Sequence, residues 1–239
     1  MTGNNQYKKF SYDHGAIVRG DTIAKAIAIV FTGDEFGDGG NFIANTLKEK
    51  SVRASFFLTG NFYRNSAYTK LIGALKKDGH YLGSHSDKHL LYCDWYKRDS
   101  LLVTKEEFSA DLQNSYTTMN DFGITKKDAP FFLPPYEWFN DSITAWTKQQ
   151  GMKLINFTPG TLSNADYTTP DMKNYRSSDT IYQSIIGYEQ KHGLNGFILL
   201  LHIGTDARRT DKMYNRLGGL LDYLKQKQYN LVRVDELLK

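Results

Sequence analysis

The stretch "KAIAIVFTGDEFGDGGNFIANTLKEK", residues 25 to 50, decides the fold class. It begins with an apolar run that is typical of a strand buried on both faces. An acidic, glycine-rich turn follows, and the stretch ends in a segment that predicts a helix. A strand followed by a helix is the repeating unit of parallel α/β folds, and the same alternation recurs along the chain.

Further apolar runs and helical segments continue this pattern to the end of the chain. The predicted strands are residues 25–31, 53–59, 80–84, 130–134, 152–157, 196–201 and 229–234. The predicted helices are residues 39–50, 67–79, 105–123, 141–151 and 215–227. No repeat or low-complexity linker divides them. We therefore expect a parallel α/β fold, open or closed, with candidate site residues just after the strands.

Composition excludes several classes of protein. The 239 residues are 40% hydrophobic and 23% charged, which is ordinary for a globular protein. The net charge of +4 comes from scattered basic residues, so we expect no nucleic-acid partner. Cys93 is the only cysteine, which excludes an intrachain disulfide. No apolar run could span a bilayer, and the opening "MTGNNQYKKF" lacks the apolar core of a signal peptide.

Two adjacent carboxylates, Asp34 and Glu35, leave the end of the first predicted strand. The turn that carries them lacks the lysine of a phosphate-binding loop and the spacing of a calcium loop. Adjacent carboxylates are tolerable if one of them binds a cation and the other acts as a base. The turn is therefore a candidate for both roles.

The segment "HSDKH" holds two histidines four residues apart. On one helical turn His85 and His89 would share a face and could both reach a single metal ion. The zinc-protease motif would need glutamate at Ser86, which disfavours that class. Two histidines and a carboxylate such as Glu35 match catalytic zinc with an open position, and they also match the ligand triad of Fe(II) oxygenases.

Two later segments supply further candidates. The segment "FFLPPYEWFN", residues 131 to 140, ends a strand with two prolines that fix a rigid loop. The segment "FILLLHIGTD" ends another buried strand at His202, which is a natural general acid at that position. Asp166, in the loop "NADYTT", could orient that histidine.

In this order the motifs resemble those of the polysaccharide deacetylases with the NodB homology domain, carbohydrate esterase family 4. The family motifs TFDD, H[ST]xxH, RxPYGxxN, DW and LxH correspond to residues 32–35, 85–89, 133–140, 166–167 and 200–202. The resemblance covers roughly residues 22 to 238. It implies a distorted (β/α) barrel of about seven parallel strands over residues 22–239, after an N-terminal extension at 1–21.

The resemblance also implies a reaction, the metal-dependent hydrolysis of N- or O-acetyl groups on an acetylated oligo- or polysaccharide. Glu35, His85 and His89 would hold one divalent ion, zinc first and nickel or cobalt as alternatives, which polarises the acetyl carbonyl. Asp34 would deprotonate the metal-bound water, and His202 would protonate the leaving group. A family member of this kind is expected outside the cytoplasm, and no obligate protein partner is evident.

The remaining matched positions imply supporting roles. Asp166 would tune His202, and the backbone N–H of Tyr136 would stabilise the oxyanion. Leu200 would contact the acetyl methyl group. The other positions that the resemblance implies for substrate binding are Pro135, Trp138 and Tyr167.

Three departures from the family motifs leave an alternative open. Glu35 replaces the metal-binding aspartate, Leu133 replaces the arginine that pairs with the base, and Glu137 replaces a glycine. Without the arginine, the chain could be a degenerate domain that binds glycan but catalyses little. An Fe(II) oxygenase is disfavoured because separate acid and base residues would be superfluous to it.

A long stretch at residues 90–108 follows the second motif and exceeds the usual family link. Its residues Tyr92, Asp94 and Trp95 are expected to shape the substrate groove.

Overall fold

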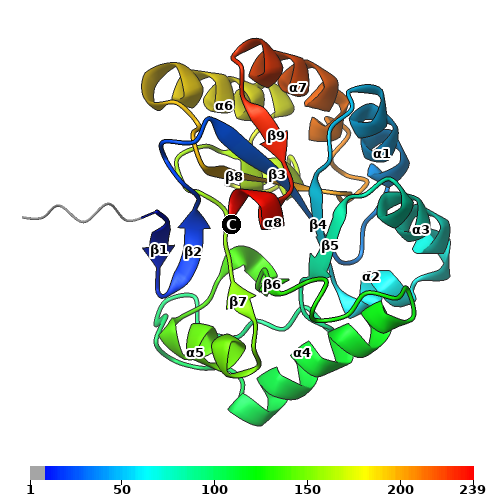
Figure 1. Ribbon diagram of the computed structural model, residues 1–239, viewed down its shortest axis with the longest axis vertical. Helices are drawn as coiled ribbons and strands as arrows, with labels where there is room; N and C mark the ends of the chain where they lie inside the picture. Colours follow the sequence, from blue (N-terminus) through cyan, green and yellow to red (C-terminus); the bar gives the residue numbers. More distant parts are fainter. Residues whose placement is uncertain (1–8) are drawn as a thin grey trace, which may run out of the picture.

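The computed structural model describes residues 9–239, and its core is a strongly curled parallel sheet (Figure 1). The sheet strands are β3 (Ala26–Gly33), β4 (Ser55–Leu58), β5 (Tyr81–Ser84), β6 (Phe131–Phe132), β7 (Lys153–Leu154), β8 (Phe197–His202) and β9 (Asn230–Val232). Their order is β7-β6-β5-β4-β3-β8, with β9 pairing with β3. The prediction of a distorted barrel of about seven parallel strands is confirmed, in the form of a half-barrel.

Strand β3 is the centre of this sheet because it pairs with three other strands. Its first half pairs with β9 and its second half with β4, while β8 runs along the other edge from Ile27 to Thr32. All three pairings are parallel. Every residue of β3 after Ala26 is buried, as expected for an apolar run covered on both faces.

Helices surround the outside of the sheet and shield it from solvent (Figure 1). They are α1 (Gly40–Glu49), α2 (Gly60–Arg64), α3 (Thr69–Lys77), α4 (Lys105–Asn120), α5 (Asp141–Gln149), α6 (Ser178–His192), α7 (Leu217–Gln226) and α8 (Val234–Leu237). The apolar pattern does not predict α6. Its buried stripe is narrow, with Ile181 and Ile185 followed by Glu189, so the sequence signal for a helix is weak.

The described part of the predicted N-terminal extension forms a hairpin of β1 (Ser11–Asp13) and β2 (Ala16–Arg19). Ile17 forms a parallel bridge with Ile155, just beyond β7. The carbonyl of Val18 accepts a 2.6 Å hydrogen bond from Thr158 Oγ1. The hairpin therefore packs at the open side of the half-barrel. Residues 1–8 of the predicted extension lie outside the described residues.

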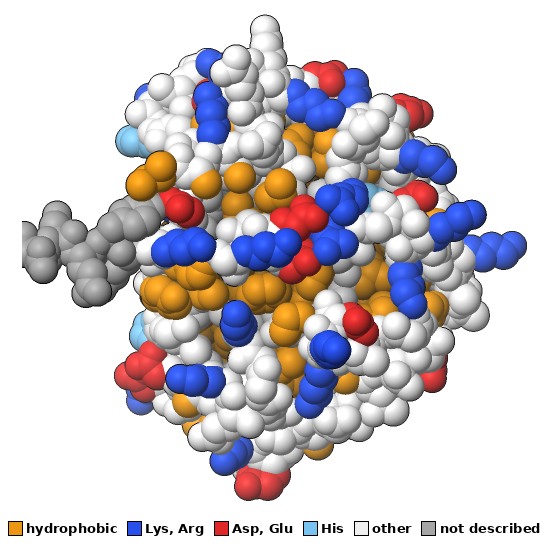
Figure 2. Space-filling model, in the orientation of Figure 1, with side chains coloured by type: hydrophobic (Ala, Val, Ile, Leu, Met, Phe, Trp, Pro, Cys, Tyr) orange, Lys and Arg blue, Asp and Glu red, His pale blue; other side chains and the backbone are white. Residues whose placement is uncertain are grey.

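Charged side chains are mixed in sign on the face that carries α8. Figure 2 shows Lys and Arg side chains interspersed with Asp and Glu, with apolar side chains between them. Among residues 9–239, no helix has the length and apolarity needed to cross a bilayer.

Candidate active site

The carboxyl ends of β3, β5 and β8 open into one cavity of about 560 Å³. The predicted site residues that line it are Asp34, Glu35, His85, His89, Tyr136, Tyr167 and His202. Trp95, from the long stretch after the second motif, lines it as well. The strand register therefore gathers most of the candidate residues in one place, as expected for chemistry at the ends of parallel strands.

The other predicted site residues lie behind the cavity wall. Leu200 is fully buried within β8, and Pro135 is buried at the start of the short 3₁₀ helix η2 (Pro135–Glu137). Trp138 is half-buried and stacks on Trp95, with ring centroids 5.8 Å apart. Asp166 is buried behind His202. These residues can shape the wall but do not line the cavity.

The segment 85–89 is a loop, so the expectation of a helical turn is wrong. Ser86 and His89 have left-handed backbone angles, with φ of 76° and 55°. Ser86 Oγ accepts a 2.9 Å hydrogen bond from the backbone N–H of His89. These local bonds compete with a helix, and the loop still brings the His85 and His89 rings to a centroid distance of 5.0 Å.

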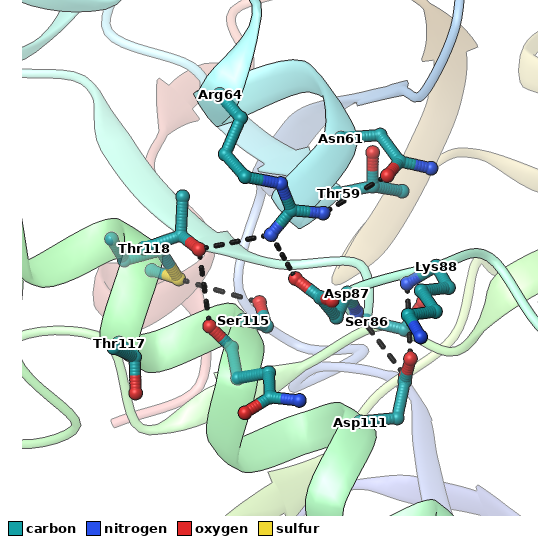
Figure 3. Close-up of polar contacts among 12 residues, drawn as sticks. Thr59, Asn61, Arg64, Ser86, Asp87, Lys88, Asp111, Ser115, Thr117 and Thr118 are labelled. Carbon is teal, nitrogen blue, oxygen red and sulfur yellow. Dashed lines mark hydrogen bonds and ion pairs between the residues drawn. The ribbon is translucent and has the colours of Figure 1, made fainter.

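A buried carboxylate from α4 holds this loop in place. Asp111 accepts hydrogen bonds from the backbone N–H groups of Asp87 and Lys88, at 3.1 and 3.0 Å (Figure 3). Tyr92, expected to shape the groove, is instead fully buried, and its hydroxyl donates to Asp111 at 3.0 Å. The long stretch therefore supports the histidine loop from behind, while Trp95 alone of its three singled-out residues lines the cavity.

The protonation of His85 follows from its hydrogen bond. Its Nδ1 lies 2.8 Å from the backbone carbonyl of Leu133, which can only accept, so Nδ1 carries the proton and Nε2 keeps a free lone pair. Burial, together with the neighbouring His89, holds the pKa of His85 well below its usual range. Burial also lowers the pKa of His89, against the pull of Asp34. Both rings are therefore neutral near pH 7, which is the form that binds metal.

Asp34 is held by two neutral donors. Thr59 Oγ1 donates to its carboxylate at 2.8 Å and Asn61 Nδ2 at 3.3 Å. Arg64 in turn donates to Asn61 Oδ1 at 2.9 Å, which turns the amide nitrogen toward Asp34 (Figure 3). The Arg64 guanidinium also pairs with Asp87 of the histidine loop. Arg64 therefore contacts both Asn61, which bonds to Asp34, and Asp87, which lies in the histidine loop.

Two further carboxylates at the site, Glu35 and Glu137, differ in exposure. The Glu35 side chain extends toward solvent, and in residues 9–239 its carboxylate has no hydrogen bond or ion pair. The Glu137 side chain is only 10% exposed, and its Oε1 lies 4.0 Å from His85 Nε2. Burial raises the pKa of Glu137 to about 7, although the neighbouring His202 opposes the rise. Sequence reasoning noted Glu137 only as a departure, because a single glutamate in a turn gives no signal of its direction.

His202 and Asp166 form a tight pair. Asp166 Oδ1 lies 2.6 Å from His202 Nδ1, and Asp166 Oδ2 accepts the backbone N–H of His202 at 2.9 Å. Burial disfavours the charged ring, but the Asp166 carboxylate outweighs it, and the pKa of His202 is raised. The bond at Nδ1 leaves Nε2 free to exchange a proton.

The side chains at the cavity include the types of ligand that a divalent ion prefers. Among them are two neutral histidines, one with its tautomer fixed by a backbone carbonyl, and a buried carboxylate without a hydrogen-bond donor. Within the part of the chain that the structure describes, no three His, Cys, Asp or Glu side chains are yet close enough to hold an ion. These side chains would therefore have to move for an ion to bind.

Comparison with known proteins identifies the family. Residues 20–155, more than half of the chain, match the family model described as polysaccharide deacetylase. The chain belongs to the polysaccharide deacetylase family. Members of this family are typically metal-dependent. The chain is also 25% identical to the peptidoglycan-N-acetylglucosamine deacetylase of Bacillus cereus over 197 residues, which span 82% of this chain and 80% of the relative.

Two solved structures share the fold of this polysaccharide deacetylase family member. PdaA, a family 4 carbohydrate esterase from Bacillus subtilis, has a TM-score of 0.71 at 22% identity and covers 94% of this chain and 85% of its own. A CE4 family pseudoenzyme from Bacillus anthracis has a TM-score of 0.72 at 19% identity and covers 95% and 70%. At such identities the likeness shows the half-barrel alone.

The family arginine has no counterpart at its own position. Leu133 is fully buried, and its contribution to the site is the backbone carbonyl that binds His85. Asp34 is held instead by hydrogen bonds from Thr59 and Asn61, in another part of the fold.

The buried carboxylate gives a first prediction, for the metal-free protein in a chelator. A carboxyl whose pKa rises on folding from 4.5 to about 7 stays protonated in the native state while the unfolded chain ionises. The free energy of unfolding should therefore fall by about 3 kcal/mol as the pH rises from about 4.5 to above 7. Glu137→Gln should remove this fall, so urea unfolding should find the variant near wild type at pH 5 and more stable at pH 8. An equal pH dependence of the two proteins would contradict the burial argument.

Proposed function

We propose that this chain is a metal-dependent carbohydrate deacetylase, a hydrolase that removes acetyl groups from nitrogen or oxygen atoms of an oligo- or polysaccharide. The observation that carries the proposal is the gathering of a carboxylate, two neutral histidines and a histidine–aspartate pair around one cavity. These are the base, the metal-ligand and the acid chemistries that acetyl hydrolysis needs. Membership of the polysaccharide deacetylase family supports the same reaction.

The divalent ion, once bound by Glu35, His85 and His89, would polarise the acetyl carbonyl and make water more acidic. Asp34 takes the proton from the attacking water. The hydrogen bonds from Thr59 and Asn61 keep its carboxylate in a fixed orientation, which is the requirement for a general base.

His202 completes the reaction by donating a proton to the leaving amine or alcohol. Its pairing with Asp166 favours the protonated ring, which is the state that a general acid needs before transfer. The backbone N–H of Tyr136 stabilises the negative charge that develops on the acetyl oxygen.

Aromatic side chains at the cavity suit a sugar substrate. Trp95 and Tyr136 are about half exposed, at 51% and 44%, and meet edge to face with ring centroids 5.6 Å apart. Tyr167 lies beside His202 at 5.3 Å. Because the Bacillus cereus relative is named for peptidoglycan, we propose a bacterial cell-envelope glycan as the first substrate to test and an extracytoplasmic location.

The direct test is acetate release over a panel of acetylated glycans that includes peptidoglycan fragments, chitin oligomers and acetyl-xylan. The zinc-loaded protein should release acetate, and a chelator should abolish the release until zinc is restored. A protein that retains a glycan on an affinity gel but releases no acetate with zinc, nickel or cobalt would be a binding module instead.

Asp34→Asn should lower kcat by about 10²–10⁴, because the amide cannot accept the proton from water. Asn is nearly isosteric and can still accept hydrogen bonds from Thr59 and Asn61, so zinc content by elemental analysis should stay near wild type. Asp222→Asn, at an exposed position on α7 that does not line the cavity, is the matched control for loss of one carboxylate charge, whereas Asp38 is the next candidate for the base. Near-normal turnover in the Asp34 variant would assign the base to another residue.

Asp166→Asn should move the alkaline limb of the kcat/KM profile to lower pH by about 1 unit. The Asp166 carboxylate raises the pKa of His202, so its loss lets the general acid deprotonate at lower pH. The measurement is kcat/KM against pH on a confirmed substrate, with zinc content checked in each protein. A fall in rate with an unmoved limb would mean that Asp166 acts only on packing.

A further inference from the structure

We infer that Glu137, at the position where the family motif has glycine, is itself a ligand of the divalent ion. The inference rests on the proposed metal-dependent function and adds to the ligands already named. It follows from three features of the site: two facing acceptors, a backbone that fixes the carboxylate, and the absence of a competing donor.

The facing acceptors are His85 Nε2 and Glu137 Oε1, which lie 4.0 Å apart. The proton of His85 is on Nδ1, where it is donated to the Leu133 carbonyl, so Nε2 presents a lone pair. When Glu137 is ionised, its oxygen and this nitrogen repel each other, and a cation bound between them would relieve that repulsion. Tetrahedral zinc binds nitrogen and oxygen ligands at about 2.0–2.2 Å, which places two ligands about 3.3–3.6 Å apart, so a shift of about half an ångström would bring both atoms onto one ion.

His202 is close enough for its charge to favour ionised Glu137, but within residues 9–239 it makes no hydrogen bond or ion pair with this carboxylate. The distance from the carboxylate to His85 Nε2 is too long for a hydrogen bond. Within residues 9–239 the carboxylate accepts no hydrogen bond from any side chain or backbone group. A carboxylate that is nine-tenths buried and lacks a donor costs free energy, and a cation in the gap would offset that cost.

The backbone holds Glu137 in a conformation that glycine adopts more readily. Tyr136 and Glu137 have φ of 59° and 53°, both in the left-handed region. Asn156 Nδ2 donates to the Glu137 carbonyl at 2.9 Å and helps to fix this turn. A glutamate that occupies a strained position and points into a site is a candidate for a role there. Glu35, by contrast, is exposed and makes no hydrogen bond or ion pair within residues 9–239.

The experiment is calorimetric titration of the metal-free protein with Zn²⁺, which needs no substrate. Glu137→Gln keeps the shape and removes the charge, and it should weaken zinc binding at least about tenfold, or 1.4 kcal/mol. Glu137→Gly, which suits the left-handed backbone, should weaken it similarly. Glu106→Gln, at an exposed position on α4, is the control for loss of one negative charge and should bind zinc within about twofold of wild type.

Each outcome separates this inference from the proposed function. If the wild type binds zinc and releases acetate but both Glu137 variants bind zinc as tightly or more tightly, Glu137 is not a ligand and the deacetylase proposal stands. If the wild type binds no Zn²⁺, both are wrong. Thermal melting of the metal-free variants shows whether each is folded. A parallel titration of Glu35→Gln measures the part that Glu35 plays.

Discussion

The parallel register of β3 with its neighbours is the constraint on which the site depends. Gly33 lies opposite Leu58 of β4, and Leu58 lies opposite Ser84 of β5. The residues that follow these three, Asp34, Thr59 and His85, therefore leave the sheet side by side. Thr59 can reach Asp34 for this reason. On the other edge Thr32 pairs with His202, so the general-acid candidate reaches the same end of the sheet.

The same register extends to the next strand and sets the chemistry of the histidine. Ser84 pairs with Phe132 of β6, so the residues after them, His85 and Leu133, are also adjacent. The Leu133 carbonyl then fixes the His85 tautomer. A leucine at this position keeps the interior apolar while its backbone still supplies the acceptor. Position 133 therefore supports His85 through its backbone carbonyl, whichever side chain it carries.

Much of the fold and of the site could be predicted from sequence, because buried strands that end in polar residues leave a local signal. This signal makes Asp34 and His202 candidate site residues. The shape of the 85–89 loop could not be predicted, since it depends on a carboxylate from Asp111 on α4 and on two left-handed residues. The orientation of the Glu137 side chain could not be predicted either, because it depends on a turn of two residues with left-handed backbone angles. The narrow apolar stripe of α6 gave too little periodicity to predict a helix.

The histidines of the cavity differ in the direction in which their surroundings shift the pKa. Burial keeps His85 and His89 neutral, whereas the Asp166 carboxylate favours the charged form of His202. The pKa values of three histidines in one cavity are thus shifted in opposite directions. Such a separation is what a site needs if it is to bind a cation and also donate a proton.

The proposed deacetylase function requires a metal ion at the carboxyl ends of β3 and β5. The most direct measurement is anomalous diffraction at the zinc edge from a crystal soaked in zinc. We predict one strong peak within about 2.0–2.2 Å of ring nitrogens of both His85 and His89 and of a carboxylate oxygen. A well-diffracting crystal with no peak at the two histidines, or with the only strong peak elsewhere on the chain, would contradict the account.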